Sequence, residues 1–288
     1  MPPSDPDRPA ALGTTPTAGR MLNTGRMPVV DLNADLAEGD HLSDRDRGVL
    51  ASVTSASLAC GFHAGGPRVM RSTAEVCVAR GVAIGAHVSY RDRAGFGRRD
   101  LDIDPGTLAS DIVEQWRILD EQVRAVGGTV SFVKPHGALY HRMGHDPAVA
   151  GAVVRAVDQV GGGALVAQAG TEVAGVAARI GLRVVAEGFP DRAYLADGHL
   201  APRSRPGALV EDPVVVGGRA VALALRGGTE AVDGSWTPVE VETLCIHGDA
   251  EGADETARAV RDALEAAGVT VRSFVDGDGS ADDGAHDR

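Results

Sequence analysis

Ionisable side chains recur directly after short apolar runs in this sequence. Histidine takes this position four times, at His63, His87, His136 and His247. Acidic, amide and basic groups accompany them, namely Asp31, Asn33, Asp35, Glu38, Lys134, Glu187, Asp191, Arg192 and Asp249. Histidine and carboxylate groups can transfer protons, cationic groups can stabilise anions, and carboxylates can hold a divalent cation. One such group alone is explained as a helix cap or a buried structural histidine, but their repetition predicts a single active site.

Lys134 is the only lysine among the 28 basic residues, and the others are arginine. An ammonium is a compact point charge that can lose its proton, whereas a guanidinium is a planar fork that stays charged. Lys134 lies in the segment KPHG, two residues before His136. We therefore predict a role that arginine cannot fill, the alternative being a codon without functional meaning.

Arginine residues flank the same segments and indicate an anionic ligand. They are Arg93, Arg98, Arg99, Arg192, Arg203 and Arg205. Guanidinium groups bind carboxylate or phosphate in a forked geometry, whereas the exposed salt bridges that they could form instead contribute little. A further pair, His141 and His145, has the spacing of metal ligands on a helix, but the HExxH pattern is absent and we expect a loop there.

Alternating strands and helices must position these groups. Apolar runs predict strands at 27–33, 52–61, 82–87, 129–134, 164–169, 183–187, 243–247 and 269–274. Helical patterns occupy 45–51, 67–80, 105–126, 146–160, 171–180 and 251–267, while 199–240 shows only an apolar stretch at 220–225. This alternation is typical of the α/β class, and the number of units favours a distorted (β/α) barrel of about seven parallel strands. The C-terminal ends of barrel strands meet at one face, so distant residues can converge there.

The composition of the whole chain excludes several classes of protein. Its 288 residues, 43% hydrophobic and 24% charged, are typical of a globular domain, which we place at 27–275 between a disordered leader (1–26) and a disordered acidic tail (276–288). A net charge of -12 and 3% aromatic residues disfavour nucleic acid as a partner. The sequence has neither an apolar run near the roughly 20 residues of a membrane span nor a secretory signal. We expect a cytoplasmic protein.

Short cofactor and disulfide motifs are also missing. The three cysteines are far apart and form no CxxC pair, which argues against a disulfide framework and a structural zinc site. No GxGxxG follows the first predicted strand, which disfavours dinucleotide binding.

Six long motifs resemble the LamB/YcsF family, the A subunits of ATP-hydrolysing 5-oxoprolinase. They are VDLNADLAEGD (30–40), SASLACGFHAGGP (55–67), GVAIGAHVSYRDRAGFGRR (81–99), VKPHGALY (133–140), AEGFPDRAYLADGHLAPRSRPGA (186–208) and CIHGDA (245–250). The resemblance spans roughly residues 27 to 274. The sequence departs from the family at Ala37, where a glycine is usual, at Val88 and Arg91, where prolines are usual, and at Pro190. None of these changes removes an ionisable group.

The resemblance implies a barrel similar to those of glycoside hydrolases and deacetylases. It also implies an activity, the opening of the lactam of 5-oxo-L-proline (pyroglutamate) to L-glutamate with ATP hydrolysis, carried out together with subunits B and C. A five-membered lactam is stabilised by resonance, so we expect ATP, accompanied by Mg²⁺, to activate it by phosphorylating the lactam oxygen. The sequence has no Walker A motif, because Pro135 follows the only lysine.

Hypothetical roles follow for two groups of residues. The expected catalytic residues are Asp35, His63, His87, Lys134, His136 and Glu187, and the expected substrate-binding residues are Asp31, Asn33, Arg98, Arg192, Arg203, His247 and Asp249. His63, His87 and His136 would transfer protons. Lys134 would place its charge on a phosphoryl group or the substrate carboxylate. Asp31, Asp35 and Glu187 would hold Mg²⁺ through ATP or orient the histidines. Arg192 and Arg203 would hold the substrate carboxylate.

Two alternatives stay open from the sequence. A metal-dependent amide hydrolase or deacetylase could use the Asp and His residues without ATP, although the His-x-x-x-His pair of many such enzymes is missing. The chain could also be a non-catalytic subunit that delivers a lactam to its partners. Whether a metal binds the protein directly is not decided by the sequence.

Overall fold

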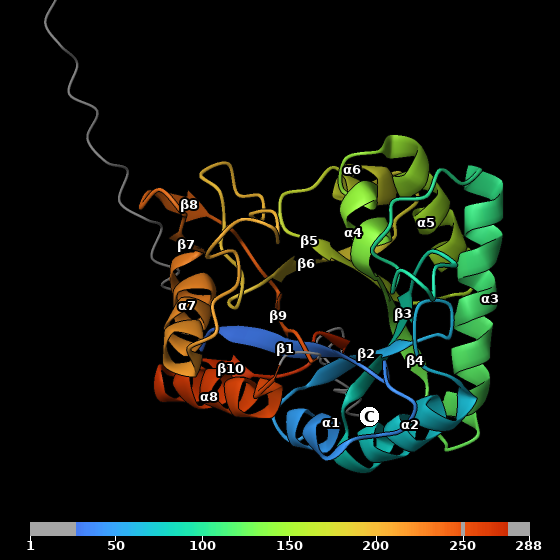
Figure 1. The fold of residues 1–288 in the computed structure, drawn as a ribbon, viewed down its shortest axis with the longest axis horizontal. Helices are drawn as coiled ribbons and strands as arrows, with labels where there is room; N and C mark the ends of the chain where they lie inside the picture. The colour runs from blue at the N-terminus through green and yellow to red at the C-terminus, as the bar shows by residue number, and fades with distance from the viewer. Residues whose placement is uncertain (1–26, 249–250, 276–288) are drawn as a thin grey trace, which may run out of the picture.

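Seven parallel strands close into a barrel in the computed structural model, which describes residues 27–248 and 251–275. In barrel order they are β1 (Val29–Leu36), β2 (Ser55–Ala59), β3 (Ala83–Val88), β4 (Val130–Pro135), β5 (Ala164–Gln168), β6 (Arg183–Gly188) and β9 (Thr243–Ile246). Pairing of β9 with both β6 and β1 completes the ring (Figure 1). The predicted seven-stranded barrel is confirmed.

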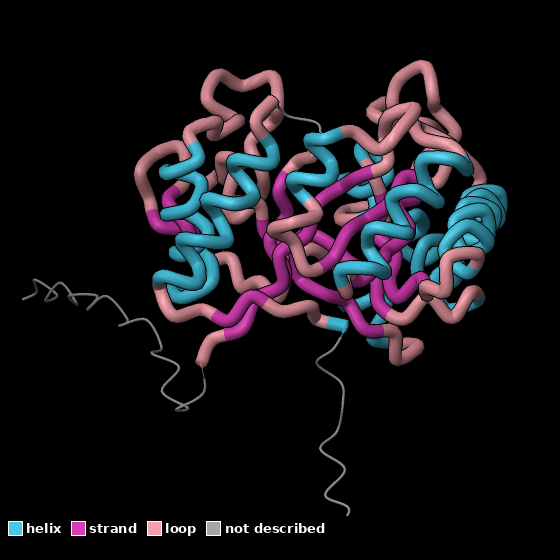
Figure 2. The backbone as a smooth tube through the Cα atoms, turned by 90° about the horizontal axis from the view of Figure 1, so that it is seen from below, coloured by secondary structure: helices cyan, strands magenta, loops and turns pink. Residues whose placement is uncertain are grey.

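Helices surround the strands on the outside of the barrel (Figures 1 and 2). They are α1 (Asp44–Val49), α2 (Pro67–Arg80), α3 (Pro105–Arg124), α4 (Gly137–Met143), α5 (Pro147–Gln159), α6 (Val173–Ala178), α7 (Pro213–Arg226) and α8 (Ala253–Ala266). Three of them, α3, α5 and α7, begin with an Asp-Pro pair in which the aspartate caps the first backbone amides and the proline occupies the first turn. Among residues 27–248 and 251–275, no helix is long and apolar enough to cross a membrane.

Strand β1 shows how the sequence divides the barrel into an apolar outside and a polar inside. Successive side chains of a strand point to opposite faces. Leu32, Ala34 and Leu36 join the main apolar core, in which a fully buried leucine contributes about 1.5–3 kcal/mol. Asp31 and Asn33 alternate with these residues, lie inside the barrel and are each only 1% exposed. The barrel interior is therefore filled by hydrogen-bonded polar groups near β1.

The structure differs from the sequence-based expectations in three places. Segment 199–240 contains helix α7 and the antiparallel strands β7 (Gly228–Glu230) and β8 (Trp236–Pro238). The helix tolerates Gly217 because α8 packs closely there: an added Cβ would lie 3.1 Å from the Cβ of Ala263. The last predicted strand is reduced to β10 (Thr270–Val271), which pairs with the start of β1.

The third difference is α4, where the expected loop around His141 is wrong. The helix follows β4 and begins at Gly137, whose φ of 57° lies in the left-handed region that glycine favours. Seven residues are too few for a helical pattern to stand out in the sequence. The predicted leader and acidic tail lie outside the described residues.

Candidate functional site

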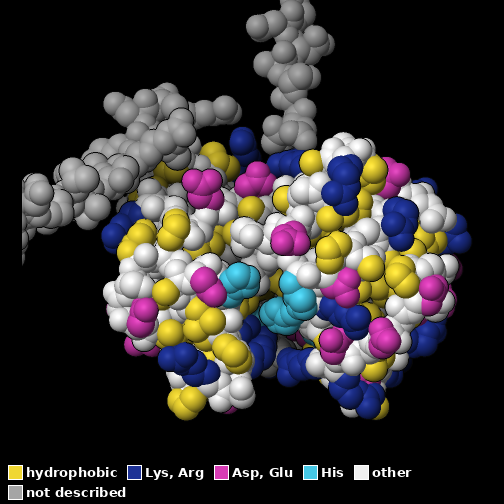
Figure 3. Space-filling view, turned by 90° about the horizontal axis from the view of Figure 1, so that it is seen from above, with side chains coloured by type: hydrophobic (Ala, Val, Ile, Leu, Met, Phe, Trp, Pro, Cys, Tyr) yellow, Lys and Arg dark blue, Asp and Glu magenta, His cyan; other side chains and the backbone are white. Residues whose placement is uncertain are grey.

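A cavity of about 390 Å³ opens at the C-terminal ends of the barrel strands. Acids, histidines and the lysine line one part of it, namely Asp35, Glu38, His87, Lys134, His136 and His247. Arg98, His141, Arg192 and Arg203 line another part. Figure 3 shows histidine side chains beside the hollow in this face of the molecule. Residues from β1, β3, β4 and β9 thus meet at one site, as the barrel prediction requires.

Lys134 is buried in a cage of polar atoms. Its Nζ lies 2.7 Å from Glu187 Oε1 and 2.9 Å from Asp35 Oδ1, and it donates to Asn33 Oδ1 at 3.1 Å. Nζ also donates to Cys245 Sγ at 3.1 Å, so polar atoms of four side chains surround the ammonium. Burial alone would lower the pKa of Lys134, but the charge of Asp35 outweighs it and, with Glu187, holds the pKa well above its usual value. Lys134 is therefore a fixed cation.

The carboxylates around Lys134 have further donors. Glu187 accepts hydrogen bonds from Tyr140 Oη at 2.7 Å and from Asn33 Nδ2 at 2.9 Å. Burial would raise the pKa of Asp35, but the adjacent Lys134 ammonium holds it below its usual range. Glu187 and Asp35 thus act as anions that the lysine keeps in place.

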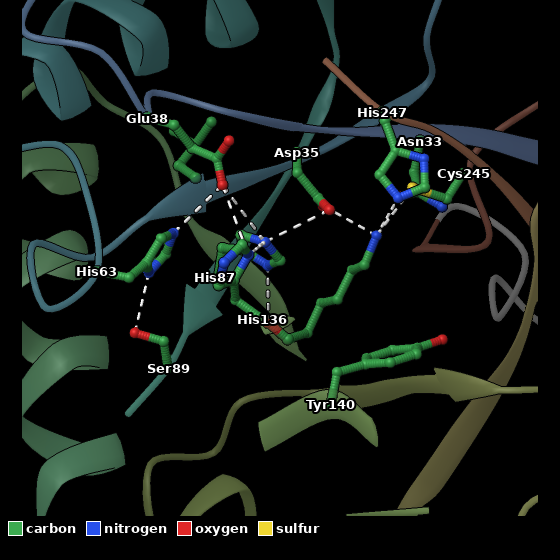
Figure 4. Close-up of polar contacts among 12 residues, drawn as sticks. Asn33, Asp35, Glu38, His63, His87, Ser89, His136, Tyr140, Cys245 and His247 are labelled. Carbon is green, nitrogen blue, oxygen red and sulfur yellow. Dashed lines mark hydrogen bonds and ion pairs between the residues drawn. The ribbon is translucent and has the colours of Figure 1, made fainter. Parts of the chain in front are cut away.

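Three histidines and Glu38 form a cluster next to this cage. Glu38 Oε1 lies 3.3 Å from His63 Nε2, 3.9 Å from His87 Nε2 and 3.6 Å from His136 Nδ1. The rings of His63 and His136 stack with centroids 4.0 Å apart. Burial lowers the pKa of both residues to about 4 and that of His87 well below its usual value, so the three imidazoles are neutral at physiological pH. Figure 4 shows the three rings beside Glu38.

His247 forms a separate pair with an acid on another loop. Its Nδ1 donates to Asp191 Oδ2 at 2.6 Å, and the same carboxylate oxygen accepts from the His247 backbone amide. This contact fixes the ring with its other nitrogen free to accept a proton, which is the arrangement of a general base.

The arginine side of the cavity carries a positive field. Burial, together with the charges of Arg192 and Arg203, lowers the pKa of His141 to about 4. Arg192 is 3% exposed, and its Nε finds no hydrogen-bond partner within the described part of the chain. A buried guanidinium nitrogen without a partner costs free energy, so this position is suited to an anionic ligand.

The structure places most of the expected site residues around the cavity. Asn33 and Glu187 lie beneath it in contact with Lys134, and His63 lies behind His136. Asp31 is further from the cavity and accepts hydrogen bonds from Thr54, Ser55 and Thr243. Asp249 lies outside the described residues.

Four residues that the expected roles omitted also belong to the site. They are Glu38, Tyr140, His141 and Cys245. The motifs NADLAEG and KPHGALYH contain the first three of these residues. Their position in the sequence, near an expected site residue, could have indicated that they belong to the site. Cys245 lies within β9 and its Sγ is 3.1 Å from Lys134 Nζ, which only the strand register reveals.

These features define a class of protein: a parallel β/α barrel with acid–base and anion-binding side chains at the C-terminal strand ends, where barrel enzymes have their active sites. The chain belongs to the LamB/YcsF family, whose sequence model matches residues 30–278.

Relatives of known name support this membership. The chain is 50% identical over 250 residues to the A subunit of 5-oxoprolinase from Streptomyces griseus, covering 85% of this chain and all of the relative. It is 49% identical over 256 residues to the protein of the same name in Mycobacterium avium, covering 86% and 100%. A solved structure, a lactam utilization protein from Thermus thermophilus, is 44% identical and superposes with a TM-score of 0.80, covering 85% and 100%.

Proposed function

We propose that this chain is the A subunit of an ATP-hydrolysing 5-oxoprolinase, which opens 5-oxo-L-proline to L-glutamate. The observation that carries the proposal is the identity of 50% with a relative of that name over the relative's whole length. The cavity supports it, because a small anionic substrate suits the positive field around Arg192 and Arg203. Subunits B and C are the proposed partners, in the cytoplasm.

The proposed reaction has three steps. The lactam oxygen first attacks the γ-phosphorus of ATP, accompanied by Mg²⁺, and the bond from that phosphorus to ADP breaks. Water then adds to the former carbonyl carbon and gives up a proton, and the protonated ring nitrogen departs as an amino group, which leaves an acyl phosphate of glutamate. A second water hydrolyses the acyl phosphate and releases glutamate and inorganic phosphate. This route avoids direct attack of water on an unactivated amide.

The residues of the cavity receive matching roles in this proposal. Arg192 and Arg203 hold the substrate carboxylate, with the unpartnered Nε of Arg192 as one donor. His247, oriented by Asp191, takes the proton from the attacking water. Lys134 acts by holding Asp35 and Glu187 in place, because its ammonium is already enclosed by these two carboxylates and Asn33.

The test is glutamate release from 5-oxoproline and ATP by the purified chain with subunits B and C. Arg192→Ala should raise KM for 5-oxoproline about 10–100-fold, since a hydrogen bond to a charged group contributes roughly 1.5–3 kcal/mol. The control is Arg124→Ala on α3, whose guanidinium is 70% exposed. No ATP-dependent glutamate release by the wild-type chain with both partners would refute the proposed function.

A second candidate is an amide hydrolase that uses a metal and no ATP. The observation that favours it is the cluster of Glu38, His63, His87 and His136, whose ligand atoms all lie within 4.8 Å of one another. Lactam or amide cleavage by the isolated chain without ATP, abolished by a chelator, would establish this function. Activity that requires ATP would exclude it.

A further inference from the structure

Four ligand-type atoms converge at one side of the cavity. They are Glu38 Oε1, His63 Nε2, His87 Nε2 and His136 Nδ1, all within 4.8 Å of one another. Glu38, His87 and His136 also line the cavity, so the point on which the atoms converge is reached from it. The four residues come from three different strand ends and the loop after β2, and the barrel brings them together.

The outer nitrogen of each imidazole shows where its proton lies. His87 Nδ1 is 3.0 Å from the backbone oxygen of Lys134, and His136 Nε2 is 2.8 Å from that of Phe96. A carbonyl oxygen only accepts, so both outer nitrogens carry the proton. His63 Nδ1 is 2.9 Å from Ser89 Oγ, whose own hydroxyl donates to the backbone oxygen of Tyr90. Ser89 therefore accepts from His63 as well.

The inner nitrogens consequently point lone pairs at one another. His87 Nε2 and His136 Nδ1 are only 2.9 Å apart, and with their protons on the far side neither can donate to the other. The carboxylate of Glu38 adds a third acceptor next to them, and Asp35 Oδ2, 3.4 Å from His87 Nε2, adds a fourth. Acceptors this close repel unless a cation lies between them, so the geometry calls for one.

The separations are close to those around a tetrahedral metal ion. Ligand atoms at about 2.0–2.2 Å from a metal are separated by roughly 3.3–3.6 Å along the edges of a tetrahedron. Of four separations between these atoms, those of 3.3 and 3.6 Å lie in this range, one of 2.9 Å is shorter and one of 3.9 Å is longer. Outer nitrogens that donate to carbonyl or hydroxyl oxygens are also the usual second shell of metal-bound histidine.

We propose that Glu38, His63, His87 and His136 bind one divalent transition-metal ion, of which Zn²⁺ is the representative. Three imidazole nitrogens and one carboxylate suit such an ion, whereas Mg²⁺ and Ca²⁺ prefer oxygen ligands. The assignment replaces the proton-transfer role expected for these histidines from the sequence. It goes beyond the proposed function, because Mg²⁺ accompanying ATP is a separate ion and the metal can be measured without any activity.

The experiment is metal binding by the full chain without an affinity tag. The protein is stripped with a chelator and titrated with Zn²⁺ by calorimetry, with bound metal measured by mass spectrometry, and Co²⁺ is added in parallel to read its coordination from the visible spectrum. We expect one equivalent of Zn²⁺ and the intense visible bands of tetrahedral Co²⁺. Mg²⁺ should not compete.

Three variants locate the ion. Glu38→Gln and His136→Ala should lower the Zn²⁺ affinity at least about 100-fold, and Ser89→Ala about 10–100-fold through loss of the second-shell contact. His247→Ala is the matched control, because His247 lines the same cavity outside the cluster. The Zn²⁺ affinity of this variant should stay at the wild-type value.

Several outcomes would overturn the proposal. One is binding of less than about 0.1 equivalent of Zn²⁺ by the wild-type chain, which would mean that a shared proton takes the place of a metal. The others are undiminished Zn²⁺ affinity in Glu38→Gln, and a loss of Zn²⁺ affinity in His247→Ala equal to that in the cluster variants. Circular dichroism checks that each variant is folded, and the Co²⁺ spectrum of the wild-type chain tests the site if His136→Ala does not fold. Loss of 5-oxoprolinase activity alone would not bear on the metal, so the two proposals fail separately.

Discussion

Replacing Lys134 by methionine tests whether the buried cage around it is held together by charge. Lys134 is 3% exposed and pairs with Glu187, which is 0% exposed, and with Asp35, which is 15% exposed. The three side chains carry a net charge of -1, and Lys134→Met makes it -2 at a site where only Asp35 is partly exposed. Removing one partner of a buried ion pair costs about 3–5 kcal/mol, because an uncompensated charge remains.

A second variant separates charge from packing. Lys134→Met combined with Glu187→Gln returns the net charge to -1, and the glutamine oxygen can still accept from Tyr140 or Asn33. We expect the double variant to be more stable than Lys134→Met by about 1–3 kcal/mol, the range of coupling between residues in contact. Lys134→Arg keeps the charge, but a planar fork cannot place its protons on acceptors gathered around a point, so we expect it to lose stability and to lose less than Lys134→Met.

The assay is urea unfolding followed by circular dichroism at pH 7, with the free energy of unfolding obtained by linear extrapolation. The exposed Arg124→Ala is the control and should change stability by less than about 0.5 kcal/mol. The reasoning fails if Lys134→Met costs less than about 1 kcal/mol, or if adding Glu187→Gln lowers stability further. Either result would show that the cage does not depend on the lysine charge.

Three further predictions concern single groups of the barrel. Burial raises the pKa of Asp31 from 3.8 to about 6, so folding takes up a proton and the wild-type chain loses stability as pH rises from 3.8 through 6. Relative to Asp31→Asn, the wild-type free energy of unfolding should fall by about 1.4 kcal/mol between pH 5 and 8, measured with urea. The same pH dependence in both proteins would contradict this prediction. Gly97→Ala would place a Cβ 2.8 Å from His136 and 3.0 Å from His63 at a φ of 64°, so glutamate release should fall more than about 10-fold. The control Gly81→Ala has a similar φ of 68° but open space around the Cβ, so it should show only the backbone strain of about 1 kcal/mol. Equal activity of the two variants would exclude the steric explanation. Tyr140→Phe removes a donor from Glu187 and should lower the free energy of unfolding by about 1–3 kcal/mol, measured with urea, and an unchanged midpoint would show that water replaces the hydroxyl.

Ala37 illustrates a departure from the family pattern that the structure explains in part. It occurs where a glycine is usual, and its φ of 60° lies in the left-handed region. An alanine thus adopts a backbone conformation that glycine favours, at a cost of about 1 kcal/mol. No ionisable group of the site is affected, as the motif itself indicated.

The elements of the barrel could be predicted because their signals are local. Helix α2 begins at Pro67 and ends before Gly81, and the sequence predicts both limits from proline at the start and glycine at the end. Segment 199–240 resisted prediction because α7 contains two adjacent glycines, which helix propensity disfavours. Close packing of α7 on α8 makes that position suitable for glycine, and packing between distant segments has no local signature.

The sequence by itself determined that the chain alternates strands and helices, that histidine and acidic residues stand at the strand ends, and that Lys134 is unique. Tertiary structure alone decided the pairings. The closure of β9 onto β1 joins segments far apart in the sequence, and the register there puts Thr243 beside Asp31 and Cys245 beside Asn33. This closure places Lys134 between Asp35 and Glu187. In the closed barrel, the backbone oxygens of Lys134 and Phe96 orient His87 and His136. Local patterns encode periodicity, whereas the distance between two side chains depends on the whole ring of strands.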